Sequence, residues 1–299
     1  MTNGGDLGKD LVKSQREHSY QPVTVPHPDY GFSVTHSTPA PSPVSTDDAW
    51  ALATHPERLI GMQTSHNFRD LGGYPTANGH MKWGVLFRAD SMHHLNDADL
   101  ALIEDLGIRN VVDLRSADEL KNRGKFPVDK YEVNFYNHSI LDLTWSEDDV
   151  PVTDDPMEFL LWAYPEMLGN GSTRFADAVK TLADADGPTI FHCAAGKDRT
   201  GLLAMMVLGS LGCDHEYIIA DYEQSDSAME RLTQWALNHS KELADRIGVT
   251  PASFLRADGR AMRIIIDGLV AEHGSLRNYT KSIGVSEATL VELEKKLVE

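Results

Sequence analysis

One short segment constrains the fold of this chain more than any other. Residues 190–201 read Ile-Phe-His-Cys-Ala-Ala-Gly-Lys-Asp-Arg-Thr-Gly, and an apolar run follows them. The pattern predicts a buried strand that ends at Cys193, a loop of small residues, and a helix that begins near Arg199. Backbone N–H groups in such a turn form a nest for an anion, and the positive end of the helix dipole strengthens it. We therefore expect this loop to hold an oxyanion against the cysteine sulfur.

The residue types in the loop suit the transfer of a phosphoryl group to sulfur. The backbone can approach a ligand closely because the residues directly after Cys193 carry little or no side chain. Arg199 can hold two phosphate oxygens in a bidentate fork, which lysine could not reproduce. Thr200 can donate its hydroxyl to the departing sulfur, and we expect His192 to hold the loop geometry through hydrogen bonds. The expected phosphate-binding residues are Ala194, Ala195, Gly196, Lys197, Asp198 and Arg199.

The complete segment resembles the loop of the cysteine-dependent phosphatases. Its Lys-Asp-Arg version is similar to the atypical bacterial tyrosine and dual-specificity phosphatases of the mycobacterial type. Further similar stretches are residues 67–74, 84–90, 107–116, 219–222 and 279–290, so that the resemblance covers roughly residues 57–299. The resemblance implies an α/β fold, hydrolysis of phosphate monoesters through a phosphocysteine, and no cofactor.

Departure of a phenoxide or alkoxide requires a proton, so a carboxylic acid should lie over the loop. Asp142 follows a strand expected at residues 132–136, where the superfamily usually carries its acid. Asp198 is the alternative; its other possible roles are to orient a neighbouring loop or to bind a substrate hydroxyl. We expect Asp113 and Arg115 to form a structural pair at the end of a central strand.

Other cysteine-based functions fit the sequence less well. An inactive phosphate-binding module would normally have lost Cys193 or Arg199, and both are present. Rhodanese-like sulfurtransferases generally lack the Ala-Gly-Lys-Asp-Arg-Thr-Gly run. Arsenate reductases need partner cysteines, and Cys213 is the only other cysteine. We expect Cys213 to be a structural thiol, with a disulfide that shields an oxidised Cys193 as the alternative.

The expected elements give an α/β domain with a mostly parallel central sheet flanked by helices. The strands are expected at residues 85–87, 110–114, 132–136 and 188–192, and a helix capped by Asn96 at 97–106. Two more helices, 157–168 and 173–183, precede the loop. After Cys213 the pattern is entirely helical, with helices at 214–223, 225–246, 258–273 and 286–298. In the family the region of about residues 145–172 forms helical cover, so we expect a lid there, with ordinary packing as the alternative.

The composition allows one large core, because 41% of the 299 residues are hydrophobic. Residues 1–50 are rich in proline, serine and threonine and should be disordered or extended, which leaves a phosphatase domain at 51–299. Acidic clusters at 147–149 and 154–155 lack a supporting histidine, so we expect no metal site. We expect a monomer.

The formal net charge of −18 argues against nucleic acid as a partner. An anionic substrate then requires a local positive pocket, which we expect from Lys197, Arg199, Arg69, Arg88 and Arg115. The expected substrate is a phosphorylated protein or a phosphoinositide, and the residues leave open which of phosphotyrosine, phosphoserine or phosphothreonine, and phosphoinositides it is. The sequence contains no membrane-spanning apolar run and no signal peptide pattern, so we expect a cytoplasmic protein, with non-classical secretion as the alternative.

Overall fold

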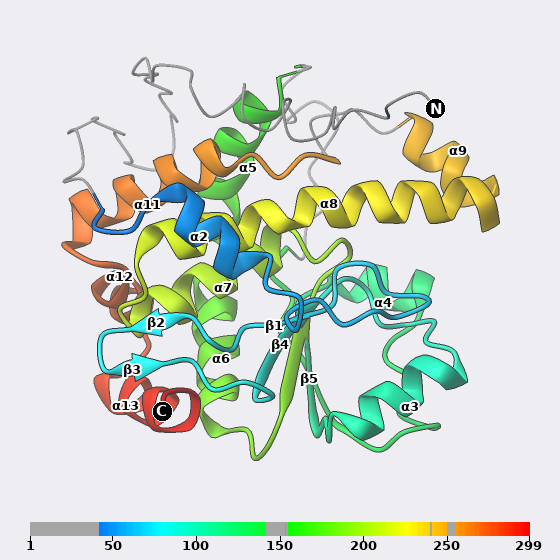
Figure 1. Ribbon diagram of the computed structural model, residues 1–299, viewed down its shortest axis with the longest axis horizontal. Helices are drawn as coiled ribbons and strands as arrows, with labels where there is room; N and C mark the ends of the chain where they lie inside the picture. The colour runs from blue at the N-terminus through cyan, green and yellow to red at the C-terminus, as the bar shows by residue number, and fades with distance from the viewer. Residues whose placement is uncertain (1–41, 142–152, 154, 240, 250–254) are drawn as a thin grey trace, which may run out of the picture.

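The computed structural model describes residues 42–141, 153, 155–239, 241–249 and 255–299 (Figure 1). Within these residues a five-stranded sheet has the strand order β1-β4-β7-β5-β6. Its strands are β1 (Arg69–Asp70), β4 (Leu86–Ala89), β5 (Asn110–Asp113), β6 (Asn134–Asn137) and β7 (Thr189–His192). Neighbouring strands are parallel except for the antiparallel edge pair of β1 and β4. The predicted α/β class with a mostly parallel sheet is confirmed.

The central strand β7 determines where the loop lies. It is buried along its whole length, and Ile190 pairs with Phe87 of β4 on one side and Val111 of β5 on the other. Successive side chains point to opposite faces of the sheet, so Ile190 and Phe191 enter two separate apolar clusters. Because β4, β5 and β7 run parallel, their carboxyl ends meet at one edge, and Cys193 follows directly there.

Helices cover both faces of the sheet (Figure 1). The short helices α3 (Asp97–Asp105) and α4 (Ala117–Arg123) lie on one side. The other elements are α2 (Thr46–Ala53), α5 (Pro156–Asn170), α6 (Ser172–Asp184), α7 (Asp198–Ser210), α8 (His215–His239), α9 (Lys241–Val249), α11 (Gly259–His273), α12 (Leu276–Ser282) and α13 (Glu287–Leu297). Helix α7 is the most buried of the helices that follow a strand, and its apolar side chains join the larger core cluster. None of the helices in the described residues combines the length and the apolarity that crossing a membrane requires.

Several element boundaries differ from the sequence-based predictions. Strand β6 begins at Asn134 rather than at residue 132. The predicted division into one helix at 214–223 and another at 225–246 is wrong, because α8 continues to His239 and α9 follows it. No glycine or proline interrupts residues 215–239, so nothing in the backbone chemistry ends the helix near residue 224. Helices α4 and α12 and the hairpin of β2 (Pro75–Thr76) and β3 (Gly79–His80) are short and were not predicted.

The helical segment before the loop is part of the core where the structure describes it. In α5 the side chains of Leu160, Ala163 and Tyr164 are fully buried and belong to the larger cluster. Residues 142–152, which include the first acidic cluster of the expected lid at 147–149, lie outside the described residues. A lid at about residues 145–172 therefore stays a prediction, and the described half of that segment is a packed helix.

The domain boundary expected at residue 50 falls inside α2. Ser45 caps this helix, with its side chain accepting a hydrogen bond from the N–H of Asp48. Ala49 and Ala53 are buried against Ala220 of α8. The packed structure therefore already includes residues 45–53, and α2 contributes to the environment of α8.

This contact can be tested with two substitutions in one helix. Ala49→Glu should lower the free energy of unfolding by about 3 kcal/mol, because it places a charge where the side chain is fully buried. Ala51→Glu, at an exposed position of the same helix, should change it by less than about 0.5 kcal/mol. Urea unfolding of the two variants gives the comparison. Equal stabilities would show that α2 does not pack on α8 in solution.

Candidate active site

The loop of residues 193–197 connects the end of β7 to the first residue of α7. Three consecutive carbonyl oxygens of this loop accept hydrogen bonds from outside it. The pairs are Ser91 N to Ala194 O at 3.1 Å, Asn67 Nδ2 to Ala195 O at 2.9 Å and Arg88 Nη2 to Gly196 O at 2.8 Å. The amide N–H groups of residues 194–196 donate to no other residue of the described chain. The carbonyl groups are thus held outward, and the N–H groups remain for a ligand.

Gly196 is required by the path of the loop. Its φ is +67°, and a Cβ at this position would lie 2.5 Å from the carbonyl oxygen of Ala89. The positive φ and the close approach both exclude a side chain. The loop therefore lies directly against the carboxyl end of β4.

The start of α7 adds to the anion site. Lys197 occupies its N-cap position, and no side chain caps the helix. The first turn of the helix thus presents N–H groups and the positive end of the dipole toward the loop. Cys193 is only 2% exposed, so an anion bound beside it would lose most of its contact with water. Thr200 is fully buried, and its hydroxyl has no hydrogen-bond partner among the described residues.

Arg199 is held by a carboxylate that the sequence analysis did not single out. Its Nη1 donates to Glu119 Oε2 at 2.6 Å and its Nη2 to Glu119 Oε1 at 3.0 Å. Glu119 also accepts the N–H of Ser116 at 2.9 Å and forms the capping box of α4 with that residue. An arginine has five N–H donors, so Nε and one hydrogen on each Nη remain for an oxyanion. The pair therefore orients the guanidinium without occupying all of its donors.

The electrostatics of this pair favour both charged forms. Burial by itself would raise the pKa of Glu119, but the hydrogen bond and the charge of Arg199 lower it to about 2. Burial would lower the pKa of Arg199, but the hydrogen bond to Glu119 and the nearby Cys193 raise it above its usual range. Arg199 therefore keeps a full positive charge next to Cys193 at every relevant pH.

Lys197 and Asp198 have partners away from the loop interior. The Nζ of Lys197 donates to the carbonyl oxygen of Arg256 at 2.8 Å and lies 3.5 Å from Asp198 Oδ1. The same Asp198 oxygen accepts the hydroxyl of Tyr164 at 2.8 Å, and Tyr164 contacts the hydroxyl of Tyr222. In this arrangement the Asp198 carboxylate is an acceptor for two neighbours. Lys197 is fully buried, so it does not present its charge at an open pocket wall.

Arg69 and Arg88, which we expected in the positive pocket, lie behind the loop. Arg69 Nε is 3.0 Å from Asp221 Oδ1, and Arg88 Nη1 donates to Asp221 Oδ2. All three side chains are buried. Burial would raise the pKa of Asp221, but the two guanidinium charges hold it well below its usual range. The expectation that these arginines line the pocket is corrected. Arg88 holds the loop backbone through the carbonyl oxygen of Gly196, and Arg69 donates to the side chain of Asn67, which in turn donates to Ala195 O.

His192, Asp113 and Arg115 form a buried cluster under the loop. Arg115 Nη2 is 2.6 Å from Asp113 Oδ2, and His192 Nε2 is 3.5 Å from the same oxygen. The Nδ1 of His192 lies 3.2 Å from the carbonyl oxygen of Cys193. Burial lowers the pKa of His192, with Asp113 opposing this shift. All three side chains are buried at the strand ends, and the Arg115 guanidinium donates to Asp113, to the Ser91 hydroxyl and to the carbonyl oxygen of Gly124.

The remaining predicted residues are accounted for as follows. Asp142 lies outside the described residues. Cys213 is buried, and burial raises the pKa of its thiol. No group of three or more His, Cys, Asp or Glu side chains in the described ranges is arranged to hold a metal ion.

Among the site residues missed from the sequence, three share one property. Glu119, Tyr164 and Asp221 each lie on a helix other than α7 and contact Arg199, Asp198 and Arg88 through tertiary packing. Only Glu119 had a local signal, because Ser116 and Glu119 have the spacing of a capping box. That signal predicts the start of a helix and does not indicate a partner for Arg199.

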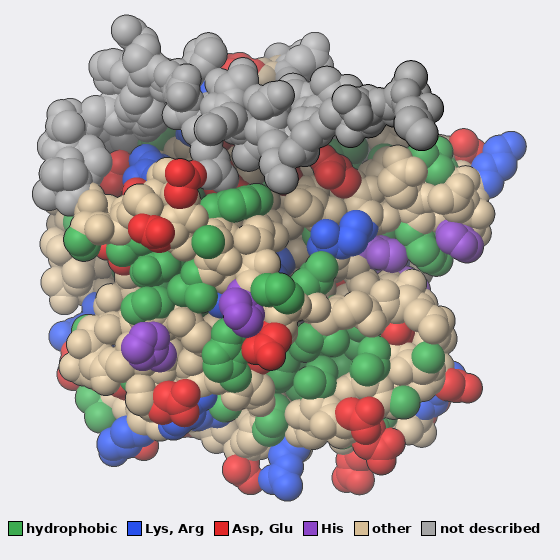
Figure 2. All heavy atoms as spheres, viewed as in Figure 1, with side chains coloured by type: hydrophobic (Ala, Val, Ile, Leu, Met, Phe, Trp, Pro, Cys, Tyr) green, Lys and Arg blue, Asp and Glu red, His purple; other side chains and the backbone are tan. Residues whose placement is uncertain are grey.

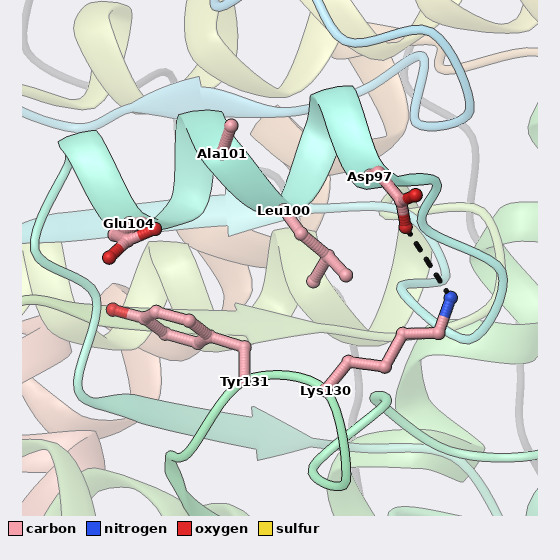
Figure 3. Close-up of a pocket in the computed structure, with 6 residues that line it drawn as sticks. All are labelled: Asp97, Leu100, Ala101, Glu104, Lys130 and Tyr131. Atoms are coloured by element: carbon pink, nitrogen blue, oxygen red, sulfur yellow. Dashed lines mark ion pairs between the residues drawn. The ribbon is translucent and has the colours of Figure 1, made fainter.

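A separate surface pocket contains none of these residues. It has a volume of about 370 Å³ and lies between α3 and the turn at residues 130–131 (Figure 3). Its rim carries an ion pair of 3.6 Å between Lys130 and Asp97, and Leu100 and Tyr131 line its wall. Acidic side chains are spread over the face shown in Figure 2, in keeping with the net charge of −18. Neither feature offers a nucleophile, so the loop remains the candidate site.

Comparison with known proteins agrees with this geometry. The sequence model of the tyrosine phosphatase family matches residues 60–299. The chain is 30% identical over 264 residues to the triple specificity protein phosphatase PtpB of Mycobacterium tuberculosis, which covers 75% of this chain and 93% of that protein. It is 28% identical over 219 residues to a tyrosine-protein phosphatase of Nostoc commune, which covers 70% of this chain and 73% of that protein.

The contact between Arg199 and Glu119 can be tested by anion binding. Glu119→Gln should weaken the binding of orthovanadate about tenfold, because the amide keeps the shape but loses the charge that orients the guanidinium. Asp118→Asn removes a neighbouring exposed carboxylate of the same helix and should leave the affinity within a factor of about two. Isothermal titration measures both. Unchanged affinity in Glu119→Gln would show that Arg199 holds its position without this partner.

Proposed function

This chain belongs to the tyrosine phosphatase family, and we propose that it hydrolyses phosphotyrosine in proteins through a phosphocysteine on Cys193. The observation that carries the proposal is the loop itself. Its carbonyl groups are held outward by Ser91, Asn67 and Arg88, so its N–H groups are left for the phosphate oxygens. Such donors are fixed before the substrate arrives and cost no reorganisation during the reaction.

In the first step the Cys193 thiolate attacks phosphorus in line with the leaving oxygen. The bond between sulfur and phosphorus forms, the bond between phosphorus and the tyrosine oxygen breaks, and that oxygen takes a proton from a carboxylic acid. In the second step water attacks phosphorus and gives a proton to the same carboxylate. The sulfur leaves as a thiolate, and inorganic phosphate is released.

Arg199 stabilises the charge that develops on the transferred phosphoryl group. Its Nε–H and remaining Nη hydrogens face away from Glu119, so they can bind two equatorial oxygens side by side. Thr200 has a buried hydroxyl without another partner, which suits donation to the sulfur as it leaves. His192 acts through the geometry of the strand end, since both of its ring nitrogens face protein atoms.

We assign the proton donor to Asp142. The rival, Asp198, accepts the Tyr164 hydroxyl at 2.8 Å and lies 3.5 Å from the Lys197 ammonium. Both contacts hold this carboxylate to protein neighbours, which suits the role of fixing the loop. The proton donor is therefore assigned to Asp142, which follows β6 in the sequence.

We infer phosphotyrosine as the substrate from the family. We also propose that other phosphate esters are substrates. The relative PtpB is described as a triple specificity phosphatase. The buried position of Cys193 suits a phosphate carried on a long arm such as phosphotyrosine. We treat phosphoserine, phosphothreonine and phosphoinositides as secondary substrates. We further propose that the enzyme acts as a monomer.

The nucleophile is tested by Cys193→Ser. This variant should fold, should still bind phosphate analogues such as tungstate, and should lose more than about 99% of its activity toward 4-nitrophenyl phosphate, because the hydroxyl is a far weaker nucleophile. Cys213→Ala is the matched control and should keep the activity. Orthovanadate should inhibit the wild type, and EDTA should not. Residual turnover of Cys193→Ser above about one per cent would contradict the phosphocysteine mechanism.

The acid is tested by leaving groups of different basicity. Asp142→Asn should slow phenyl phosphates with poor leaving groups by about 10²–10⁴-fold and activated esters far less, because good leaving groups need no proton. Asp198→Asn should lower the rate for all esters to a similar degree. A series of substituted phenyl phosphates gives the slope for each variant. The assignment is reversed when the steeper dependence appears in Asp198→Asn.

A further inference from the structure

The carboxylate of Asp198 is an unfavourable charge beside an anion site. Asp198 is the first residue of α7 and follows the loop directly. Burial lowers the pKa of Arg199, whereas the hydrogen bond to Glu119 and the charges of Cys193 and Asp198 raise it. The Asp198 charge is therefore felt at the guanidinium that binds the phosphate oxygens. A like charge close to the site weakens the binding of a phosphate dianion unless other groups offset it.

Two neighbours can offset the charge of Asp198. Its Oδ1 accepts a hydrogen bond from the Tyr164 hydroxyl at 2.8 Å and lies 3.5 Å from the Lys197 ammonium. The ammonium is shared, because it also donates to the carbonyl oxygen of Arg256 at 2.8 Å. The Tyr164 contact is shorter and comes from a different helix, α5. Tyr164 is thus the group that ties the carboxylate to the core.

The direction of the hydrogen bonds follows from the number of hydrogens. A hydroxyl has one hydrogen, and an ionised carboxylate can only accept. Tyr164 donates to Asp198, so in its 2.5 Å contact with the Tyr222 hydroxyl Tyr164 is the acceptor and Tyr222 the donor. Burial raises the pKa of each tyrosine well above its ordinary value, and the charge of Asp198 adds to the increase. Both hydroxyls therefore keep their hydrogens at every relevant pH.

Packing holds the two tyrosine rings in place. Both rings are buried, and they meet edge to face with centroids 6.2 Å apart at 86°. Tyr222 also lies against α7, since a Cβ on Gly201 would be 2.9 Å from the Tyr222 ring. The side chain of Asp198 is 25% exposed, so packing alone does not hold its carboxylate. A hydroxyl on a tightly packed ring can hold it in one place.

We propose that Tyr164 is a positioning residue of the anion site. Its hydroxyl holds the Asp198 carboxylate against Lys197 and so keeps this charge from opposing the substrate phosphate. Tyr222 supports the arrangement by donating to the Tyr164 oxygen. The inference rests on the proposed function, because it takes the loop as the place where the phosphate reacts. It assigns a role to a side chain of α5 that acts through Asp198.

This role predicts a specific kinetic effect. A carboxylate that is free to turn repels the phosphate in the bound substrate and in the transition state alike, so KM should rise and kcat should be retained. A tyrosine that only filled space would act differently, because its loss would lower the fraction of folded enzyme and with it kcat. A partly exposed charge changes affinity by up to about fivefold, which sets the expected size of the effect.

The experiment compares three variants in which a tyrosine loses only its hydroxyl. Tyr164→Phe should weaken tungstate binding, measured by isothermal titration, about fivefold and raise KM for 4-nitrophenyl phosphate by about the same factor, with kcat retained. Tyr222→Phe leaves the donor to Asp198 in place and should stay within about twofold of the wild type. Tyr279→Phe is the control, because its buried hydroxyl has no hydrogen-bond partner among the described residues.

A second substitution shows whether Tyr164 acts through Asp198. In the wild-type background Asp198→Asn should change the affinity for tungstate by less than about twofold, because the charge that it removes is already offset. In the Tyr164→Phe background the same substitution should restore the affinity to within about twofold of the wild type. A residue that only fills the core gives no such rescue.

Three results would overturn the role of Tyr164. They are wild-type affinity and KM in Tyr164→Phe, an equal loss in Tyr222→Phe, and a double variant that binds tungstate no better than Tyr164→Phe. Should Tyr164→Phe fail to fold, Asp198→Asn alone decides, because an increase in affinity of more than about twofold would show that the charge is not held back. Wild-type protein that binds tungstate without hydrolysing 4-nitrophenyl phosphate refutes the proposed function, whereas wild-type turnover with an unchanged Tyr164→Phe refutes only this inference.

Discussion

The arrangement of the site depends on the ion pair between Arg88 and Asp221. Arg88 reaches the carbonyl oxygen of Gly196 with one nitrogen and the carboxylate of α8 with another. A buried guanidinium without a partner costs several kcal/mol, so each of these groups needs the others. Because this pair lies directly behind the loop, it keeps the loop carbonyl outward. The anion site at the front is therefore a consequence of charge pairing at the back.

The site also brings together residues that are far apart in the sequence. Glu119 and Arg199 are separated by 80 residues, and Arg88 and Asp221 by 133 residues. The parallel sheet makes these contacts possible because it gathers the ends of β4, β5 and β7 at one edge. Each strand end contributes support groups, and only β7 carries the nucleophile. The reacting residues therefore lie on one short segment, and residues from many other segments hold them in position.

The reacting segment could be predicted from the sequence, and most of the residues that position it could not. The strand at Thr189–His192, the loop and α7 could be predicted, because a periodic apolar pattern and local loop chemistry determine them. Glu119 as the partner of Arg199 could not be, since a pairing across the fold leaves no local trace. The start of β6 was missed because pairing with β5 decides where that strand begins. The division of α8 was wrong although residues 215–239 contain no glycine or proline that would end a helix. Arg69 and Arg88 were correctly seen as important cations and wrongly placed at the pocket wall.

The position of Glu119 on α4 has a consequence for local unfolding. None of the seven residues of α4 is buried, so the capping box and a few surface contacts hold the helix. Regions of this kind open and close far more often than a core helix, and their amides exchange with solvent correspondingly fast. The Glu119 carboxylate, which orients Arg199, therefore lies on a helix of low local stability. Substrate that binds to Arg199 should therefore slow the hydrogen exchange of the α4 amides.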